Sequence, residues 1–189
     1  MKRTKLIIII VLCLVIIYGV WRFNKNRQEV AAVKNLSFDT YTSRGLGFAI
    51  EYPKGWTIRE GTPGIDPNKY WAVVFTSPEW EVATDDDKQF PNFAVNYYAS
   101  LDTLLAFEER TLESKTLENF IESSKLMSGA RRTTLAGNTA WRAIVHGDDE
   151  IDTIFVERGG HVYALGVSNG IGLTDPLAEK MISSFVFTQ

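Results

Sequence analysis

The sequence predicts an α+β domain built on an antiparallel sheet of about six to seven strands, with one transmembrane helix ahead of it. In the first half of the domain, apolar residues alternate with period two; they then recur at helical spacing, and alternate again before a last helix. This order of elements is typical of an antiparallel α+β sandwich. Turn dipeptides such as Gly137-Asn138 and Gly159-Gly160 separate successive apolar runs, which is the strongest local signal for hairpins.

The amino-terminal segment predicts an uncleaved signal anchor at residues 6–21, behind a basic head at residues 1–5. The run of sixteen residues carries no charge, and as a helix it would reach about 24 Å. Lys5 and Arg22 can extend outward and lengthen the match to a hydrocarbon layer roughly 30 Å thick. A cleaved signal peptide is the alternative, with its cleavage site after Ala32. The lipid bilayer is therefore the first predicted partner.

Residues 22–40 form a polar linker, and residues 41–189 form the predicted folded domain. Basic residues flank the apolar run almost equally, so their count leaves the orientation nearly balanced. A long carboxyl-terminal segment crosses a membrane largely regardless of its charge. We therefore expect a single-pass protein of the cell membrane, with its domain on the extracytoplasmic side.

Charge is distributed unevenly along the chain. Six of the 20 basic residues precede Glu29, whereas none of the 23 acidic residues does, which leaves 14 basic against 23 acidic residues in the rest. Because domains that bind nucleic acids concentrate Lys and Arg on one face, the composition argues against such a partner. The only cysteine, Cys13, lies in the apolar run. The domain therefore has no thiol for a disulfide, a thiolate metal site or a cysteine nucleophile.

The first half of the domain is predicted to consist of strands. Residues 48–59 alternate on either side of a corner at Pro53 and Gly55, which predicts an opening hairpin. The same period-two pattern predicts strands at residues 71–75 and 93–97.

Helical spacing follows these strands. A first helix is predicted from Thr103 to about Arg110, with Asp102 as its cap, and a second helix from Thr116 to Met127.

Strand signals then return, and the chain closes with a helix. Residues 154–156 and 163–165 are apolar on both faces, so we expect their strands to be covered on both sides. Asp175 or Thr174 can cap the last helix, with Pro176 in its first turn. The predicted strands of this half are 131–135, 139–146, 151–158 and 161–168.

Three stretches of the domain resemble the PsbP-like family. The first stretch, within residues 41–56, has a residue pattern like the opening of that family's sheet. Residues 134–140 are similar to its small-residue turn, and residues 181–187 resemble its final helix and terminal strand. The resemblance implies an α/β/α sandwich with a central antiparallel sheet, and a role without catalysis, as in the extrinsic subunits of the plant photosystem. The photosystem role itself is not carried over. The opening pattern consists of Tyr41, Ser43, Gly47, Phe48, Ile50, Tyr52, Pro53, Gly55 and Trp56.

Two acidic groups are candidates for binding a hard cation such as calcium. Carboxylate oxygens suit that ion, but neither group has the spacing of an EF-hand loop, and acidic turns are commonly just solvated. The sequence therefore predicts no metal site and no cofactor. The candidate ligands are Asp85, Asp86 and Asp87 in one loop, and His146, Asp148 and Asp149 at a predicted hairpin end.

Trp80 is the candidate for binding a partner, because it lies in the loop at residues 77–91, away from any apolar period. Loops on a rigid scaffold often carry recognition, and aromatic side chains are frequent interface anchors. The alternative is that the ring folds back over the edge of the sheet.

No catalytic residue is predicted. Neither His146 nor His161 comes with a nucleophile motif, and phosphate-binding loops and zinc-ligand spacings are absent from the sequence. We expect a membrane-anchored extracytoplasmic binding or scaffold module that contacts another envelope protein or a small ligand. The alternatives are a small hydrolase or metal-dependent enzyme using the His146 hairpin, and a structural accessory subunit of a membrane protein complex.

Overall fold

The computed structural model describes residue 18 and residues 33–61, 66, 68–78, 93–108, 116–147, 150–167 and 175–188. The chain divides into two units, Met1–Leu36 and Ser37–Gln189. The predicted basic head, the predicted anchor apart from Tyr18, and residues 22–32 of the predicted linker lie outside the described residues. Within the ranges given above, no helix is both long and apolar enough to cross a membrane.

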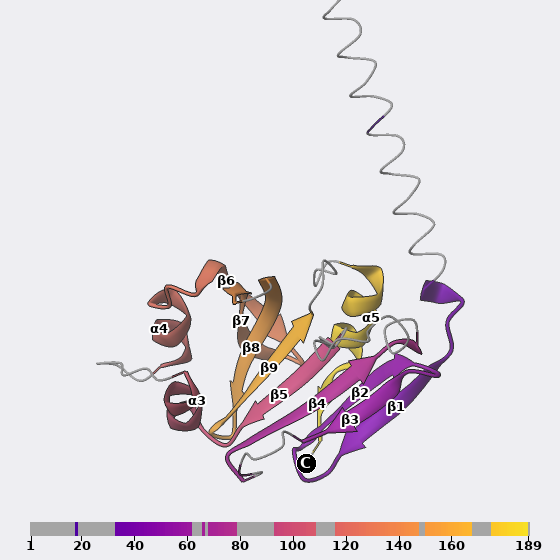
Figure 1. The fold of residues 1–189 in the computed structure, drawn as a ribbon, viewed down its shortest axis with the longest axis horizontal. Helices are drawn as coiled ribbons and strands as arrows, with labels where there is room; N and C mark the ends of the chain where they lie inside the picture. Colours follow the sequence, from indigo (N-terminus) through magenta and orange to yellow (C-terminus); the bar gives the residue numbers. More distant parts are fainter. Residues whose placement is uncertain are drawn as a thin grey trace, which may run out of the picture. The chain divides into compact units, whose positions relative to one another are not determined.

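The unit Ser37–Gln189 contains two antiparallel sheets (Figure 1). In the described residues, its strands are β1 (Phe38–Ser43), β2 (Phe48–Pro53), β3 (Thr57–Glu60), β4 (Tyr70–Thr76), β5 (Phe93–Tyr98), β6 (Met127–Leu135), β7 (Asn138–His146), β8 (Glu150–Arg158), β9 (His161–Val167) and β10 (Val186–Phe187). The smaller sheet has the order β1-β2-β10, and the larger has the order β3-β4-β5-β9-β8-β7-β6. The seven strands of the larger sheet confirm the predicted antiparallel sheet.

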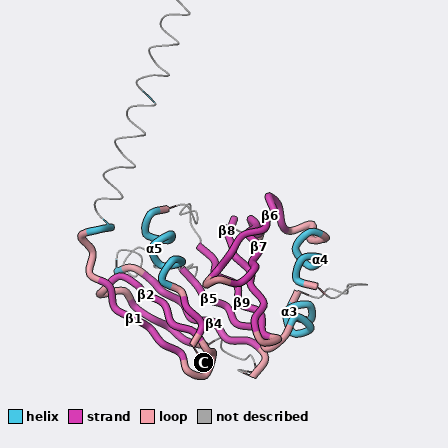
Figure 2. Tube along the Cα trace, turned by 180° about the vertical axis from the view of Figure 1, so that it is seen from behind, coloured by secondary structure: helices cyan, strands magenta, loops and turns pink. Residues whose placement is uncertain are grey.

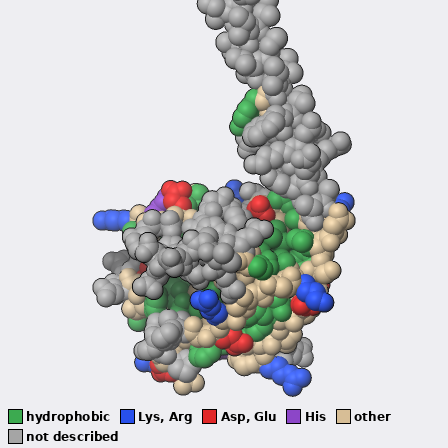
Figure 3. All heavy atoms as spheres, turned by 45° about the vertical axis from the view of Figure 1, so that its right-hand side comes forward, with side chains coloured by type: hydrophobic (Ala, Val, Ile, Leu, Met, Phe, Trp, Pro, Cys, Tyr) green, Lys and Arg blue, Asp and Glu red, His purple; other side chains and the backbone are tan. Residues whose placement is uncertain are grey.

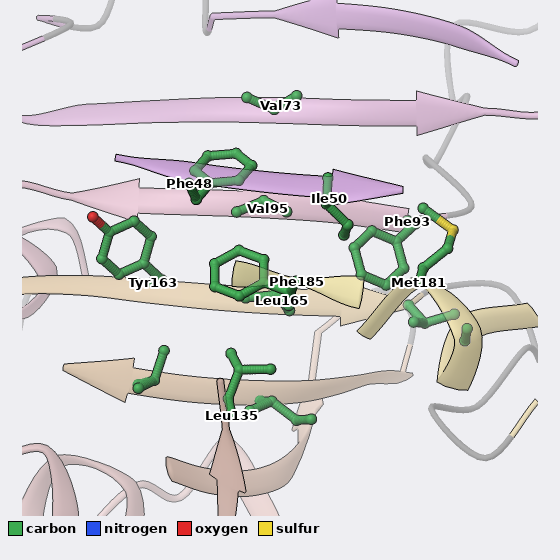
Figure 4. Close-up of a cluster of buried hydrophobic side chains, with 14 of the residues drawn as sticks. Phe48, Ile50, Val73, Phe93, Val95, Leu135, Tyr163, Leu165, Met181 and Phe185 are labelled. Atoms are coloured by element: carbon green, nitrogen blue, oxygen red, sulfur yellow. The ribbon is translucent and has the colours of Figure 1, made fainter. Parts of the chain in front are cut away.

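The larger sheet buries apolar residues on both faces. On one face, α3 (Leu101–Phe107) and α4 (Leu117–Glu122) enclose a cluster that includes Phe120 and Phe155. On the other face, the small sheet and α5 (Pro176–Ser184) enclose a second cluster around Phe48, Tyr163 and Phe185. Figure 4 shows the side chains of Phe48, Tyr163 and Phe185 gathered between the strands. The strands β8 and β9 contribute to both clusters, which confirms the predicted two-sided burial.

The outer layers differ from a simple α/β/α sandwich. Figure 2 shows α3 and α4 together on one side of the molecule and α5 on the other, beside the small sheet. The layer that contains α5 is therefore mixed, since α5 packs on β2 of the small sheet. Phe48 of β2 stacks on Phe185, just after α5, with ring centroids 5.4 Å apart. Burying these aromatic side chains holds the mixed layer on the larger sheet.

The predicted opening hairpin at residues 48–59 is wrong. The strand β2 pairs with β1 on one edge and with β10 on the other, so no edge remains for β3, which pairs with β4 in the larger sheet. The predicted corner is present, because Pro53 ends β2 and Gly55 has a φ of 89°. The corner passes the chain from one sheet to the other. Its residues look the same in sequence whichever sheet follows, so the local pattern does not identify the partner.

The helix caps agree with the sequence except at α3. Ser100 caps α3 by accepting a hydrogen bond from the backbone nitrogen of Thr103, whereas the predicted cap, Asp102, lies in the first turn. Both residue types favour this position, and only the backbone of Ser100 has the extended conformation that a cap requires. Asp175 caps α5, with Pro176 following it, as predicted.

The second predicted helix is shorter than expected. Thr116 caps α4, but the helix ends at Glu122 and Met127 already belongs to β6. At the amino end of the domain, β1 includes residues 38–40, which the sequence assigned to the linker.

A candidate anion-binding cleft

A cleft of about 270 Å³ lies where the β1–β2 turn meets the ends of β5, β8 and β9. We call this feature the cationic cleft, because its lining contains two arginines but no Asp or Glu. The lining residues are Arg44, Gly45, Leu46, Gly47, Tyr97, Arg158, Gly159, His161, Tyr163, Phe187 and Thr188.

The β1–β2 turn forms one wall of the cleft. The backbone nitrogen of Gly47 donates to the carbonyl of Ser43 at 2.9 Å, and the backbone nitrogen of Thr188 donates to the carbonyl of Gly47 at 2.9 Å. Gly47 has a φ of 71°, in the left-handed region that favours glycine, and a Cβ there would lie 3.5 Å from the carbonyl oxygen of Thr188. Glycine is therefore favoured by the backbone conformation of the turn, since a Cβ at that distance would be in ordinary van der Waals contact.

His161 is held from two sides. Its Nδ1 lies 2.9 Å from the hydroxyl of Tyr97 and 2.9 Å from the carbonyl oxygen of Ala99. Because a carbonyl oxygen only accepts, the contact with Ala99 assigns the hydrogen of the neutral ring to Nδ1. Nε2 is then the unprotonated nitrogen, and it has no hydrogen-bond partner among the described residues.

Tyrosine hydroxyls line the interior of the cleft. The Tyr163 hydroxyl donates to the carbonyl of Leu46 at 2.8 Å, and its ring meets the Tyr97 ring edge to face at 5.5 Å. Burial raises the pKa of both Tyr97 and Tyr163 above the usual value for a phenol. Both groups therefore remain neutral hydroxyls at physiological pH.

The charged groups of the cleft come from different segments. Arg44 lies in the β1–β2 turn, and Arg158 ends β8, where its guanidinium sits 4.5 Å above the Phe187 ring. Neither arginine forms an ion pair with another described residue. Thr188 adds a buried hydroxyl oxygen without a described hydrogen-bond partner. On the face shown in Figure 3, by contrast, visible Lys and Arg side chains lie singly, interspersed with acidic ones.

A second hollow, of about 340 Å³, lies between α5 and the β6–β7 hairpin. Its arginine is already neutralised, because Arg142 donates to both carboxylate oxygens of Asp152, with Nε 2.8 Å from Oδ1. The hydrogen bonds that Arg142 donates to Asp152 raise the pKa of Arg142. This hollow therefore presents a compensated ion pair, whereas the cationic cleft presents uncompensated positive charge.

His146, the histidine of the proposed hydrolase, contacts a serine and a glutamate. Its Nε2 lies 2.7 Å from Ser128 Oγ, and its Nδ1 lies 3.3 Å from Glu150 Oε1. The connectivity is that of a nucleophile, a base and an orienting acid. However, the side chains of His146 and Glu150 are 39% and 74% exposed, and none of the three residues lines either hollow. The acid of this group is therefore exposed to solvent, and the three residues lie outside both hollows.

The other predicted site residues, namely Trp80, Asp85, Asp86, Asp87, Asp148 and Asp149, lie outside the described residues. Within the described ranges, no group of three or more His, Cys, Asp or Glu side chains is arranged to hold a metal ion. The sequence reasoning missed the cleft. Its residues are separated by up to 144 positions, from Arg44 to Thr188, and no local motif links them. The available signal was a histidine directly after the Gly159-Gly160 turn, with an arginine directly before it.

These features define an α+β domain of two packed antiparallel sheets with a cationic cleft at one end. The structure is similar to the solution structure of cyanobacterial PsbP from Synechocystis sp. PCC 6803, with a TM-score of 0.45 and 14% sequence identity, over 80% of this chain and 93% of that one. No family model matches the chain. No curated protein matches it either.

Proposed function

We propose that the protein is a membrane-anchored extracytoplasmic binding module without catalytic activity, and that the cationic cleft is its ligand site. The observation that carries the proposal is the meeting of Arg44, Arg158 and His161 with two neutral tyrosine hydroxyls in one hollow. Binding sites typically combine a concave, partly aromatic wall with a few converging polar groups, and this cleft has both.

The absence of catalysis is part of the proposal, supported by the chemistry of the cleft. The lining holds one histidine but no Ser, Cys, Asp or Glu side chain. A Ser or Cys nucleophile activated by a histidine that a carboxylate orients therefore has no counterpart in this lining. The rival hydrolase would have to use Ser128, His146 and Glu150, which lie on an open surface.

Ligand binding at the cleft is tested with the full-length protein in mild detergent. A panel of neutral, cationic and anionic small molecules is screened by thermal shift, and each hit is measured by calorimetry. Gly45→Phe is designed to block the cleft, because Gly45 is one of its lining residues. The turn should tolerate the side chain, since a Cβ at Gly45 meets no atom within 4 Å and the backbone is not in the left-handed region.

The matched control for this block is Thr139→Phe, at an exposed position outside both hollows. We expect at least one hit to be lost in Gly45→Phe and kept in Thr139→Phe. A panel without a hit, or hits that survive the block, would remove the cleft as the ligand site.

The membrane anchor rests on the apolar run at residues 6–21. We expect the protein to stay with membranes through a high-salt and alkaline wash and to be released by detergent. Release by the wash alone would contradict the anchor. In intact cells, protease added from outside is expected to remove the domain, and protection of the domain would reverse the proposed orientation.

A macromolecular partner is the second candidate, because the loop at residues 77–91 carries Trp80. Co-purification from detergent, with and without residues 79–90, is expected to show an envelope protein that is lost on deletion. Crosslinking in native membranes distinguishes an accessory subunit, which remains in a stable complex, from a module that binds its partner transiently.

A further inference from the structure

We infer that the cationic cleft takes a small molecule with an aromatic or other flat apolar body and one oxyanion group, a carboxylate or a phosphate. The inference rests on the proposed function, since it names the ligand class of the same site. Four properties of the cleft carry it: its charge, the orientation of one arginine, its neutral hydrogen-bonding groups and its size.

The charge of the cleft is opposite to that of the domain around it. The chain after residue 28 has 23 acidic and 14 basic residues, yet the cleft gathers Arg44 and Arg158 with no acidic residue in its lining. Both side chains are exposed and free of ion pairs with other described residues, so no described carboxylate competes with a ligand for them. A ligand anion placed between them would interact with both charges at once.

Arg158 is oriented for this role. Its guanidinium lies over the face of Phe187, 4.5 Å from the ring centroid. In addition to this cation–π contact, the guanidinium N–H groups have no hydrogen-bond partner among the described residues, and such groups match the two oxygens of a carboxylate or phosphate. Phe187 is in turn fixed by edge-to-face contacts with Tyr163 and Phe185, each with centroids 5.1 Å apart. The N–H groups of the Arg158 guanidinium are therefore partly pre-organised before a ligand binds.

Neutral polar groups complete the site. The hydroxyl of Tyr97 lies beside His161, and the hydroxyl oxygen of Thr188 is buried behind the cleft surface. Because burial keeps Tyr97 and Tyr163 protonated, neither adds a negative charge that would repel an anion. Hydroxyls and an imidazole can donate to or accept from the remaining polar atoms of a ligand.

The size of the cleft limits the ligand. A volume of about 270 Å³ is just below the range of about 300–1,000 Å³ that is usual for drug-sized ligands. The rings of Tyr97, Tyr163 and Phe187 offer apolar surface to the body of the ligand. A single flat ring with one oxyanion group satisfies both conditions.

The test uses full-length protein in mild detergent and four probes: benzoate, phenyl phosphate, benzamide and inorganic phosphate. Benzamide is the neutral isostere of benzoate, so the comparison isolates the charge. We expect calorimetry to show that benzoate or phenyl phosphate binds at least about tenfold more tightly than benzamide, with affinity falling as salt is added. Inorganic phosphate lacks the apolar body, and we expect it to bind more weakly than phenyl phosphate.

Two variants assign the effect to the arginines. Arg44→Gln and Arg158→Gln are each expected to weaken binding of the oxyanion probe by about tenfold, whereas Arg158→Lys, which keeps the charge but loses the fork, should lie in between. Arg131→Gln is the matched control, because Arg131 is an exposed arginine on β6 outside the cleft. All three positions are exposed, so we expect the four variants to have unchanged melting temperatures, which would confirm that they fold.

The outcomes separate the inference from the proposed function. If benzamide binds as tightly as benzoate, or if the cleft arginine variants bind like Arg131→Gln, the inference is wrong. If a neutral or cationic molecule of the panel binds and is lost in Gly45→Phe, the cleft remains a ligand site while the oxyanion class is overturned. If none of the four probes binds, the oxyanion inference is overturned as well, and the panel alone then decides whether the cleft is a site.

Discussion

The two ends of β8 each have a histidine near a turn, but they differ in what surrounds it. At the Glu150 end, His146 contacts Ser128 and Glu150 on an open surface. At the Arg158 end, His161 is held by Tyr97 and Ala99, inside a cleft that the β1–β2 turn and β10 close. His161 belongs to a cleft because a second layer of structure, the small sheet, encloses it. Hydrogen-bond connectivity alone, as at His146, does not make a pocket.

The largest expected effect is alkaline destabilisation, because several buried tyrosines must ionise together. Burial raises the pKa of Tyr41 to about 12, and it also raises the pKa of Tyr97, Tyr98 and Tyr163. A raised pKa in the folded state means that stability is fully present below the unfolded pKa of about 10. This stability is lost as the pH rises through the folded values.

We therefore expect the urea midpoint of the full-length protein to be constant from pH 8 to about pH 10 and to fall steeply towards pH 12. Tyr163→Phe removes a tyrosine of the cleft end and should reduce that fall. A midpoint that does not change up to pH 12 would contradict the burial of these hydroxyls.

The second effect contrasts two arginines. Arg142→Gln breaks the bidentate pair with Asp152, whose side chains are only 17% and 18% exposed. We expect the free energy of unfolding to fall by about 1.5–3 kcal/mol, as for hydrogen bonds to charged groups. Arg158→Gln loses only a contact with Phe187 at an exposed site and should cost at most about 1 kcal/mol. Urea unfolding followed by tryptophan fluorescence measures the free energy of unfolding of both variants. Equal losses of stability would contradict the proposed difference between the two hollows.

The third effect concerns the turn that encloses the cleft. Gly47→Ala introduces a Cβ at a φ of 71°, 3.5 Å from the carbonyl oxygen of Thr188, and should cost about 1–2 kcal/mol. Gly45→Ala in the same turn meets no atom within 4 Å and should change stability by less than about 0.5 kcal/mol. If the two alanines cost the same, Gly47 does not determine the shape of the turn.

The smallest effect is expected at the His146 end. Ser128→Ala and His146→Ala should each change the free energy of unfolding by less than about 0.5 kcal/mol, because Ser128 is exposed and His146 is 39% exposed. With p-nitrophenyl acetate, we expect the wild type and both variants to hydrolyse the ester at the rate of buffer. Hydrolysis by the wild type that either substitution abolishes would support the hydrolase and contradict a non-catalytic module.

The sequence predicted most elements, because their signals are local. The turns at Gly137 and Gly159, the cap at Asp175 and the two-sided burial of β8 and β9 all depend on a few neighbouring residues. Among the wrong predictions, one concerned a helix cap for which two nearby residues were equally suitable, and another a strand whose pairing partner could not be identified locally. Ser100 and Asp102 are both good cap residues, and the corner at Pro53 is the same whether the next strand pairs with β2 or with β4.

The candidate site could not be predicted in this way. Of the predicted site residues, His146 is the one that the structure describes, and it lies outside both hollows. The cleft depends on β10, which adds two residues to the edge of β2 and brings Phe187 and Thr188 beside the turn that carries Arg44. The resemblance of residues 181–187 to a final helix and terminal strand implied this strand, but two residues carry almost no signal for the edge that they join. The position of β10 is decided by the edge of β2 that does not pair with β1.

The sequence by itself determined the acidic, thiol-free composition of the domain, the order of its strands and helices, and the faces on which they bury apolar residues. These properties follow from residue type and from periods of two or 3.6 residues, which act over a few positions. The tertiary structure alone decided which sheet each strand joins and that Arg44, Arg158 and His161 share a cleft. The physical reason is that strand pairing and sheet packing join residues more than a hundred positions apart, and no local interaction encodes such a meeting.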